Sequence, residues 1–169
     1  MAGFPKLIPA FTAQIAIKAP NYVGPTAAGA TLTHVEIIPG AGSIRAEAGY
    51  GIALDAVFAH GADFIKMDPD GRHVRLEVQS VAKDGPTGAF VRFNYTGTIF
   101  LGGPGGKVLT GEPDAKTTDF GEAFTRVVFE SGHPELAALQ TKVYVSSGRF
   151  IVEPGKPVIV EYKISEVVA

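Results

Sequence analysis

The sequence contains no cysteine and no tryptophan among its 169 residues. Without cysteine the chain cannot form disulfide bonds, thiolate metal sites or a cysteine nucleophile, and nothing in it favours an oxidising compartment. The 15 Lys and Arg residues face 17 Asp and Glu residues, which gives a formal net charge of −2 without any basic block. Because nucleic acids are bound by clustered positive charge, we expect no nucleic acid as a partner.

Long apolar runs are also missing from the sequence. No segment approaches the roughly 20 apolar residues that a membrane-spanning helix requires, so no membrane partner is expected. The first 20 residues, MAGFPKLIPAFTAQIAIKAP, include three prolines and Gln14 and lack a basic leader. We interpret them as an entry segment and first strand, and we expect a cytoplasmic location.

What the sequence does contain is the alternation of β-strands. Near the end of the chain Val158, Val160, Tyr162 and Ile164 fall on one face of a strand, while the residues between them fall on the other. Most of the chain repeats this pattern. It predicts strands at 11–18, 31–38, 52–59, 73–82, 89–101, 124–130, 139–146, 149–153 and 157–167.

Gly (21 residues) and Pro (12 residues) are distributed as turn signals and not collected in a linker. Asp68–Gly71 and Asp84–Gly88, for example, are predicted turns between strands. We therefore expect residues 1–169 to form a single all-β domain. A sheet of this size must close or stack to bury its apolar faces, which favours a barrel or sandwich with an interior.

Helix signals are sparse. Residues 131–139 predict one or two helical turns, with Pro134 at the first helical position and Glu135 near the amino end. Residues 102–121 have little periodicity and predict a long surface loop. The glycine cluster LGGPGGKVL at 101–109 does not fit a phosphate-binding loop, because its spacing is too short and Val108 follows Lys107. We interpret it as a hairpin loop.

Histidine and carboxylate residues offer a metal site as one alternative. His34 and Glu36 share a strand face, and His60 lies three residues before Asp63, so a two-His site completed by carboxylates is an alternative. The four histidines are nevertheless dispersed, and no HxH, HExxH or GxSxG motif occurs. We expect neither a metal nor a cofactor.

Polar residues that recur on strand faces are the stronger functional signal. Glu77, Arg92, Arg126 and Glu130 each alternate with apolar neighbours. One interpretation places them on a solvated outer face. The other places them in a pocket, where an Arg would meet a ligand carboxylate or enolate and a Glu or Tyr would transfer a proton. Alternation shows which residues share a face but not which face is inward.

A series of short motifs resembles the DUF3237 family, also called UPF0311, and in particular its fungal branch. The motifs are GADF (61–64), HVRLEV (73–78), FNYTG (93–97), FTRVVFESGHPEL (124–136) and VYVSSGRFIVEPGKPVIVEYKISEV (143–167). The resemblance covers about 29–167. It implies a single antiparallel, calycin-like β-barrel with one short helix. It also implies that the protein forms homo-oligomers. Bacterial members usually carry tryptophan where this chain has Phe64 and near Leu139.

Two functional hypotheses follow. The first is a cofactor-independent isomerase, cyclase or lyase acting on a small apolar metabolite of polyketide or terpenoid type, held inside the barrel. Its candidate acid and base are Asp63 and Glu77. Its candidate binding residues are Arg92, Tyr95, Arg126, Glu130, Tyr144 and His34. Tyr95 and Arg92 have opposite parity, so both face inward only if a bulge intervenes.

The second hypothesis is a non-catalytic carrier of the lipocalin kind or an oligomeric binding module, with a mainly apolar interior and titratable groups at its mouth. A third alternative is an oligomeric structural protein whose barrel is filled by side chains and has no cavity. Composition and motifs do not separate these alternatives.

Overall fold

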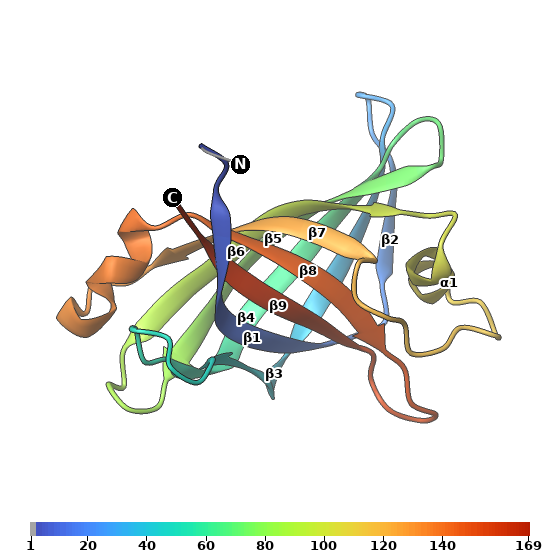
Figure 1. Cartoon of the computed structure of the whole chain (residues 1–169). Helices are drawn as coiled ribbons and strands as arrows, with labels where there is room; N and C mark the ends of the chain where they lie inside the picture. Colours follow the sequence, from blue (N-terminus) through green and yellow to red (C-terminus); the bar gives the residue numbers. More distant parts are fainter. Residues whose placement is uncertain (1–2) are drawn as a thin grey trace.

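A computed structural model describes residues 3–169, and its strands form one antiparallel sheet that curls into a barrel (Figure 1). The strands are β1 (Lys6–Ile17), β2 (Asn21–Pro25), β3 (Thr31–Ala46), β4 (Asp55–Met67), β5 (His73–Asp84), β6 (Phe90–Phe100), β7 (Ala123–Glu130), β8 (Tyr144–Ile151) and β9 (Ile159–Val168). The predicted break at 147–148 is absent, because β8 runs straight through Gly148.

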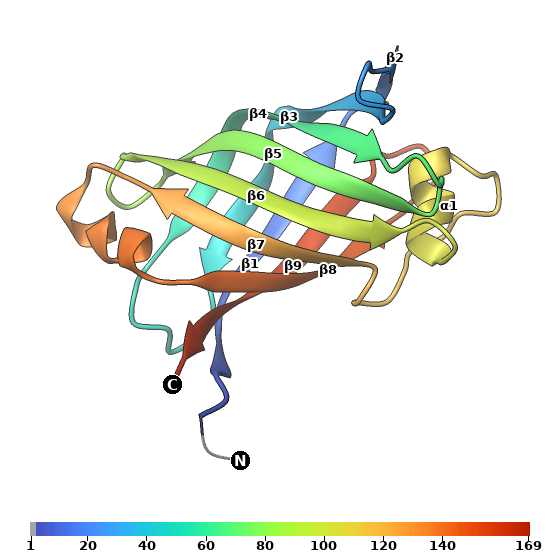
Figure 2. The same ribbon diagram turned by 90° about the horizontal axis from the view of Figure 1, so that it is seen from above.

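The barrel closes through its first strand. The strand order is β1-β9-β8-β7-β6-β5-β4-β3-β2, and β1 also pairs with β3, so eight strands form the closed ring and β2 lies outside it beside β3. Figure 2 shows β1 and β9 running together to the two chain ends. The prediction of an antiparallel β-barrel is confirmed.

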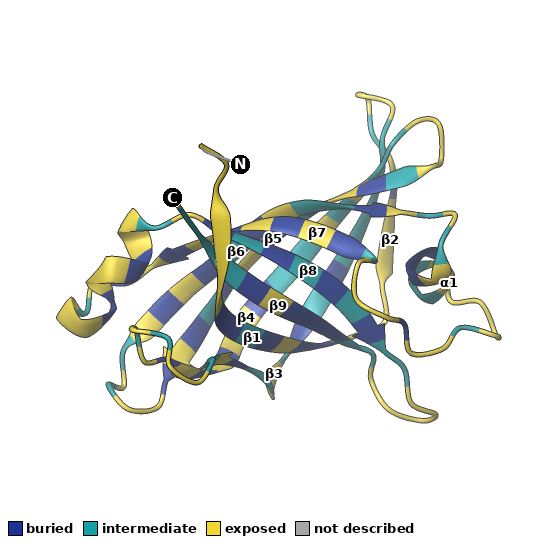
Figure 3. Ribbon diagram, in the orientation of Figure 1, coloured by how far each residue is buried: buried dark blue, intermediate teal, exposed yellow. Residues whose placement is uncertain are grey.

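Alternating side chains build the core. In β7 every second residue is buried, and β5 and β6 follow the same pattern, so dark and light bands alternate along these strands in Figure 3. The centre of the core is aromatic. Phe93 is fully buried, and its ring centroid lies 5.7 Å from Phe58, 5.7 Å from Tyr95 and 5.3 Å from Phe129. Offset and edge contacts of this kind stabilise aromatic pairs beyond the area they bury.

β3 pairs with three strands, β1, β2 and β4, and its register is irregular near its middle. Its register with β4 shifts between Glu36 and Ser43, and Gly40 within this interval has a φ of 75°. A Cβ atom on Gly42 would lie 2.5 Å from the carbonyl oxygen of Gln14, so the strands can approach this closely only at glycine. The predicted strand 31–38 is therefore extended to Ala46 in the structure.

Short helices lie at the two ends of the barrel (Figure 1). The 3₁₀-helix η1 (Pro134–Thr141) begins at Pro134, as the sequence predicts. The helix α1 (Pro104–Thr110) occupies the opposite end, so the prediction of a loop over 102–121 and a hairpin loop at 101–109 is wrong there. No helix within residues 3–169 has the length and apolarity needed to cross a membrane.

The sequence of α1 has little helical periodicity, and contacts with other parts of the chain stabilise the helix. Pro104 starts the helix, and Gly111 ends it in the left-handed conformation with a φ of 70°. The backbone N–H of Gly105 donates a hydrogen bond of 2.7 Å to the carboxylate of Glu122. Because this partner lies 17 residues away, a local sequence window does not reveal it.

Candidate functional site

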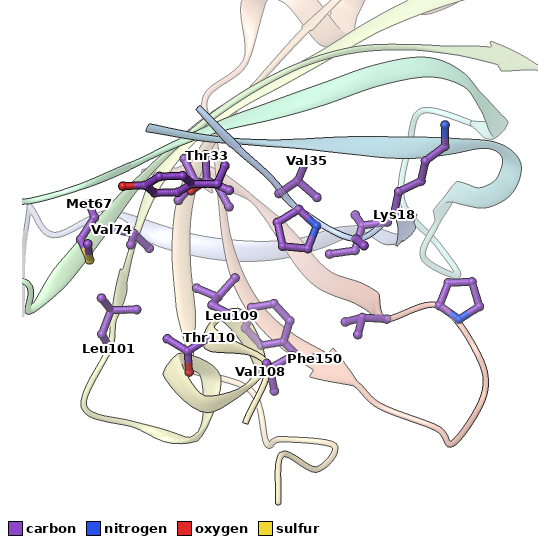
Figure 4. Close-up of a pocket in the computed structure, with 18 of the residues that line it drawn as sticks. Lys18, Thr33, Val35, Met67, Val74, Leu101, Val108, Leu109, Thr110 and Phe150 are labelled. Carbon is purple, nitrogen blue, oxygen red and sulfur yellow. The ribbon is translucent and has the colours of Figure 1, made fainter. Parts of the chain in front are cut away.

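A cavity of about 520 Å³ opens at the α1 end of the barrel. We call it the outer chamber. Figure 4 shows Val108 and Leu109 of α1 on one side and Thr33 and Val35 of β3 on another, with Phe150 between the helix and the wall. Its lining is mainly apolar, and its volume lies within the range of small-molecule sites. α1 therefore forms part of a ligand-sized cavity.

A second, smaller cavity continues the first toward the barrel centre. This inner chamber has a volume of about 30 Å³, and both chambers are lined by Ile17, Val35, Ile65, Leu109 and Phe150. Polar groups enter its wall from three strands: Asp63 on β4, Tyr95 on β6 and Tyr162 on β9. The two chambers are thus adjacent, and three polar side chains lie at the inner one.

The position of Asp63 follows from the strand register. Asp63 pairs with Val35 on one side and Val78 on the other, both buried inward-facing residues, so its side chain shares their inward direction. Regular pairing of β4 with β5 is interrupted between the Asp63–Val78 and Lys66–Arg75 pairs. In this interval the backbone N–H of Glu77 donates to the Asp63 carboxylate at 2.9 Å. One carboxylate oxygen is therefore fixed by the backbone.

The apolar surroundings control the charge of Asp63. Burial raises its pKa to about 7, the hydrogen bond from the Glu77 amide opposes this rise, and the nearby Glu77 charge adds to it. Burial also raises the pKa of Tyr95 and of Tyr162, and the charge of Asp63 contributes in both cases. At neutral pH the two phenols are hydrogen-bond donors, while Asp63 exchanges between acid and carboxylate.

The family model for DUF3237, described as a protein of unknown function, matches residues 5–167. The chain belongs to the DUF3237 family. No match was found among curated proteins.

Solved structures share the DUF3237 barrel. A conserved protein of unknown function from Rhodopseudomonas palustris has a TM-score of 0.73 at 22% identity, covering 99% of this chain and 100% of its own. A β-barrel-like protein from Acinetobacter baumannii has a TM-score of 0.70 at 16% identity, with 99% and 98% covered. A structure described as an enzyme from Penicillium herquei has a TM-score of 0.62 at 12% identity, with 99% and 97% covered. At these identities the likeness shows the fold.

The DUF3237 barrel brings together two of the residues that the sequence singled out, Asp63 and Tyr95. Tyr162 completes the group. It was not a candidate, although the alternation of the last strand places it on one face with Val158, Val160 and Ile164. Its ring centroid lies 5.0 Å from that of Tyr95 in an edge-on arrangement.

Four other candidates lie on the outer face of this barrel, which agrees with the solvated-face interpretation and not with a place inside the barrel; Glu77 and Arg126 line shallow hollows on that outer face. Glu77 forms an ion pair of 2.7 Å with Lys66, Arg92 pairs with Glu130, and Arg126 is exposed. The residues that alternate with them point into the barrel and are mostly apolar. Closing the barrel buries this alternate set of side chains and leaves the four candidates outside.

The last two candidates also lie away from the chambers. The His34 ring packs against Phe64 at 5.1 Å between centroids, on the outer side of β3. Tyr144 is fully buried among core aromatic rings, and its hydroxyl lies 2.9 Å from that of Tyr50. Neither lines the outer or the inner chamber.

Within residues 3–169, one trio of metal-ligand types lies close together. Atoms of Asp68, Asp70 and His73 lie within 4.8 Å of one another in the turn between β4 and β5. Asp68 already accepts a 2.6 Å bond from the guanidinium of Arg75, which lowers the pKa of this carboxyl. The ion pair and the turn account for the cluster, and we assign no metal to it.

Proposed function

We propose that the protein binds a small, mainly apolar metabolite in the two chambers and transfers a proton on it without a cofactor, as an isomerase, cyclase or lyase. The observation that carries this proposal is Asp63, whose pKa is raised to about 7 at the inner end of an apolar cavity. A carboxyl group with this pKa can both accept and release a proton near neutral pH.

The geometry supports a simple sequence of steps. The Asp63 carboxylate removes a proton from a carbon or oxygen of the ligand and becomes the neutral acid. The electron pair moves onto a ligand oxygen, to which the hydroxyl groups of Tyr95 and Tyr162 donate hydrogen bonds. In an isomerisation, Asp63 returns the proton to another carbon as the electron pair leaves the oxygen. In a ring closure, the electron-rich carbon instead bonds to a carbonyl carbon of the same ligand, and Asp63 protonates the oxygen that receives the C=O electron pair. In a lyase reaction, the electron pair expels a leaving group, which takes the proton from Asp63. A polyketide- or terpenoid-like body fits the apolar lining of the outer chamber.

The similarity to a Penicillium herquei structure described as an enzyme is consistent with catalysis in this barrel. A carrier function is the second candidate, favoured by the apolar lining of the outer chamber. We place either activity in the cytoplasm, since the chain has no cysteine.

Deuterium exchange of a model ketone tests the proposal without the natural substrate. We expect the protein to speed exchange of the α-protons of 4-phenylbutan-2-one in D₂O, followed by NMR. Asp63→Asn should reduce the catalysed rate by about 10²-fold or more, because the amide is no base. Arg92→Met is the matched control: this outer-face residue should leave the rate unchanged.

Equal catalysed rates in the wild type and Asp63→Asn would contradict the assignment of Asp63. Chemical-shift changes that show binding of the ketone, without catalysed exchange in any variant, would support the carrier function instead.

We also propose that the chain forms homo-oligomers through its outer wall. Leu7 and Phe124 are 57% and 60% exposed and line one shallow groove with Val145 and Lys163. Phe124→Lys is expected to lower the molar mass measured by light scattering, because it places a charge in an apolar contact. A monomeric wild type would disprove self-association.

A further inference from the structure

The inner chamber contains negative charge and no positive charge to balance it. Among the described residues that line it, the ionisable ones are Asp63, Tyr95 and Tyr162. No Lys, Arg or His is among these lining residues. The other walls are apolar, with Val35 from β3 and Val78 from β5 packed beside the carboxyl group. Outside the wall, the neighbouring Glu77 is also acidic, and its charge is paired with Lys66 on the outer face.

Positive charges reach only the outer chamber, and both of them have acidic partners. Lys18 forms a 2.6 Å ion pair with Glu36, and Lys156 pairs with Glu153. The lysine side chains are 50% and 70% exposed, so solvent screens what remains of their charge. An anionic ligand group that entered the inner chamber would leave these cations behind and approach a carboxylate.

The size of the inner chamber limits what can enter it. Its volume of about 30 Å³ is enough for about two water molecules, and therefore for a hydroxyl or amino group with its carbon. The apolar body of a ligand must then remain in the outer chamber of about 520 Å³. One oxygen of Asp63 accepts a hydrogen bond from the Glu77 amide, and Asp63 lines the inner chamber, where a ligand donor would meet its carboxyl group.

We infer that the cavity selects apolar ligands that carry a hydrogen-bond donor, an alcohol or an amine, at the end that enters first, and that it rejects carboxylate and phosphate ligands. The donor lies against Asp63. This inference rests on the proposed function, since it takes the same cavity as the ligand site. It adds the polarity and the orientation of the ligand.

Three probes share a phenyl group on a four-carbon chain and differ in the terminal group: 4-phenylbutan-1-ol, 4-phenylbutan-1-amine and 4-phenylbutanoic acid. They compare an alcohol, an amine and a carboxylate at the same site. Calorimetric titrations at about pH 6 and about pH 8.5 lie on either side of the Asp63 pKa of about 7. At the higher pH we expect the acid to bind at least about tenfold more weakly than the alcohol, because two carboxylates repel in an apolar site. At the lower pH this ratio should shrink severalfold.

Asp63→Asn is the matched variant, because its amide oxygen still accepts the Glu77 N–H. In this variant we expect the alcohol-to-acid ratio to lose its pH dependence and the acid to bind more tightly than in the wild type. If the amine is the preferred donor, it binds more tightly than the alcohol at high pH. If a neutral hydroxyl is preferred, the order is reversed. Both results support the inference.

Three results would overturn it: an acid that binds within about threefold of the alcohol at high pH, a ratio that Asp63→Asn leaves unchanged, or no binding of either donor at millimolar concentration. Failure of catalysis is distinguishable. If the three probes follow the expected order but the ketone shows no catalysed exchange, the ligand selectivity stands and the proposed proton transfer does not.

Discussion

Asp63→Asn is expected to raise the free energy of unfolding by up to about 4 kcal/mol above pH 7.5 or so, and to change it little near pH 4. Folding raises the pKa of Asp63 from 3.8 to about 7. Between these two values the unfolded chain releases the proton while the folded chain retains it, so wild-type stability falls as the pH rises through this window. Asparagine carries no charge and avoids this cost.

Urea unfolding followed by circular dichroism, repeated across the pH range, measures the effect as a difference between variant and wild type. All other titrating groups cancel in that difference. Asp84→Asn is the control of opposite sign. Asp84 is buried and accepts bonds from the Asp55 N–H and the Thr87 hydroxyl, and its pKa is lowered. Its substitution should destabilise the protein at high pH, with the loss fading as the pH falls below 4 or so. A pH-independent difference for Asp63→Asn would disprove the raised pKa.

Phe93→Ala is expected to lower the free energy of unfolding by about 3–5 kcal/mol. Phe93 has no exposed surface, and its ring packs against rings from β4, β6 and β7. These neighbours are held by strand pairing, so they cannot collapse into the space that the ring leaves.

Phe90→Ala removes the same ring from a position that is 59% exposed on the outer wall. It should change the stability of the monomer by no more than about 0.5 kcal/mol. Chemical denaturation of both variants gives the comparison, and similar losses for the two would show that burial does not control the contribution of these rings.

Strand alternation predicted most of the barrel because each strand carries its own signal. β5 and β6 were predicted within two residues of their bounds, since His73–Asp84 and Phe90–Phe100 alternate without interruption. β2 was missed: it has only five residues, with Gly24 and Pro25 among them, and depends on pairing with β3. α1 was missed for a similar reason, because its contacts are distant in sequence.

The candidate site was predicted only in part, since alternation defines two faces and barrel closure decides which one is buried. For β6 the outer set includes Arg92 and the inner set includes Tyr95, and the sequence gives both equal weight. Tyr162 approaches Asp63 and Tyr95 only because β9 takes its place in the ring. Each of the three residues lies in a different motif, at 61–64, 93–97 and 143–167, and no local motif links them.

Closure of the ring by β1 and β9 sets the order of events during synthesis. β1 is made early and has β9 and β3 as its neighbours, so it lacks one of them until Val168 has left the ribosome. Until then β1 and β8 present unpaired edges to other chains in the cell. Tyr162 arrives with β9, so water still reaches the wall beside Asp63 in the nascent barrel. The raised pKa of Asp63 therefore develops only when the last strand docks.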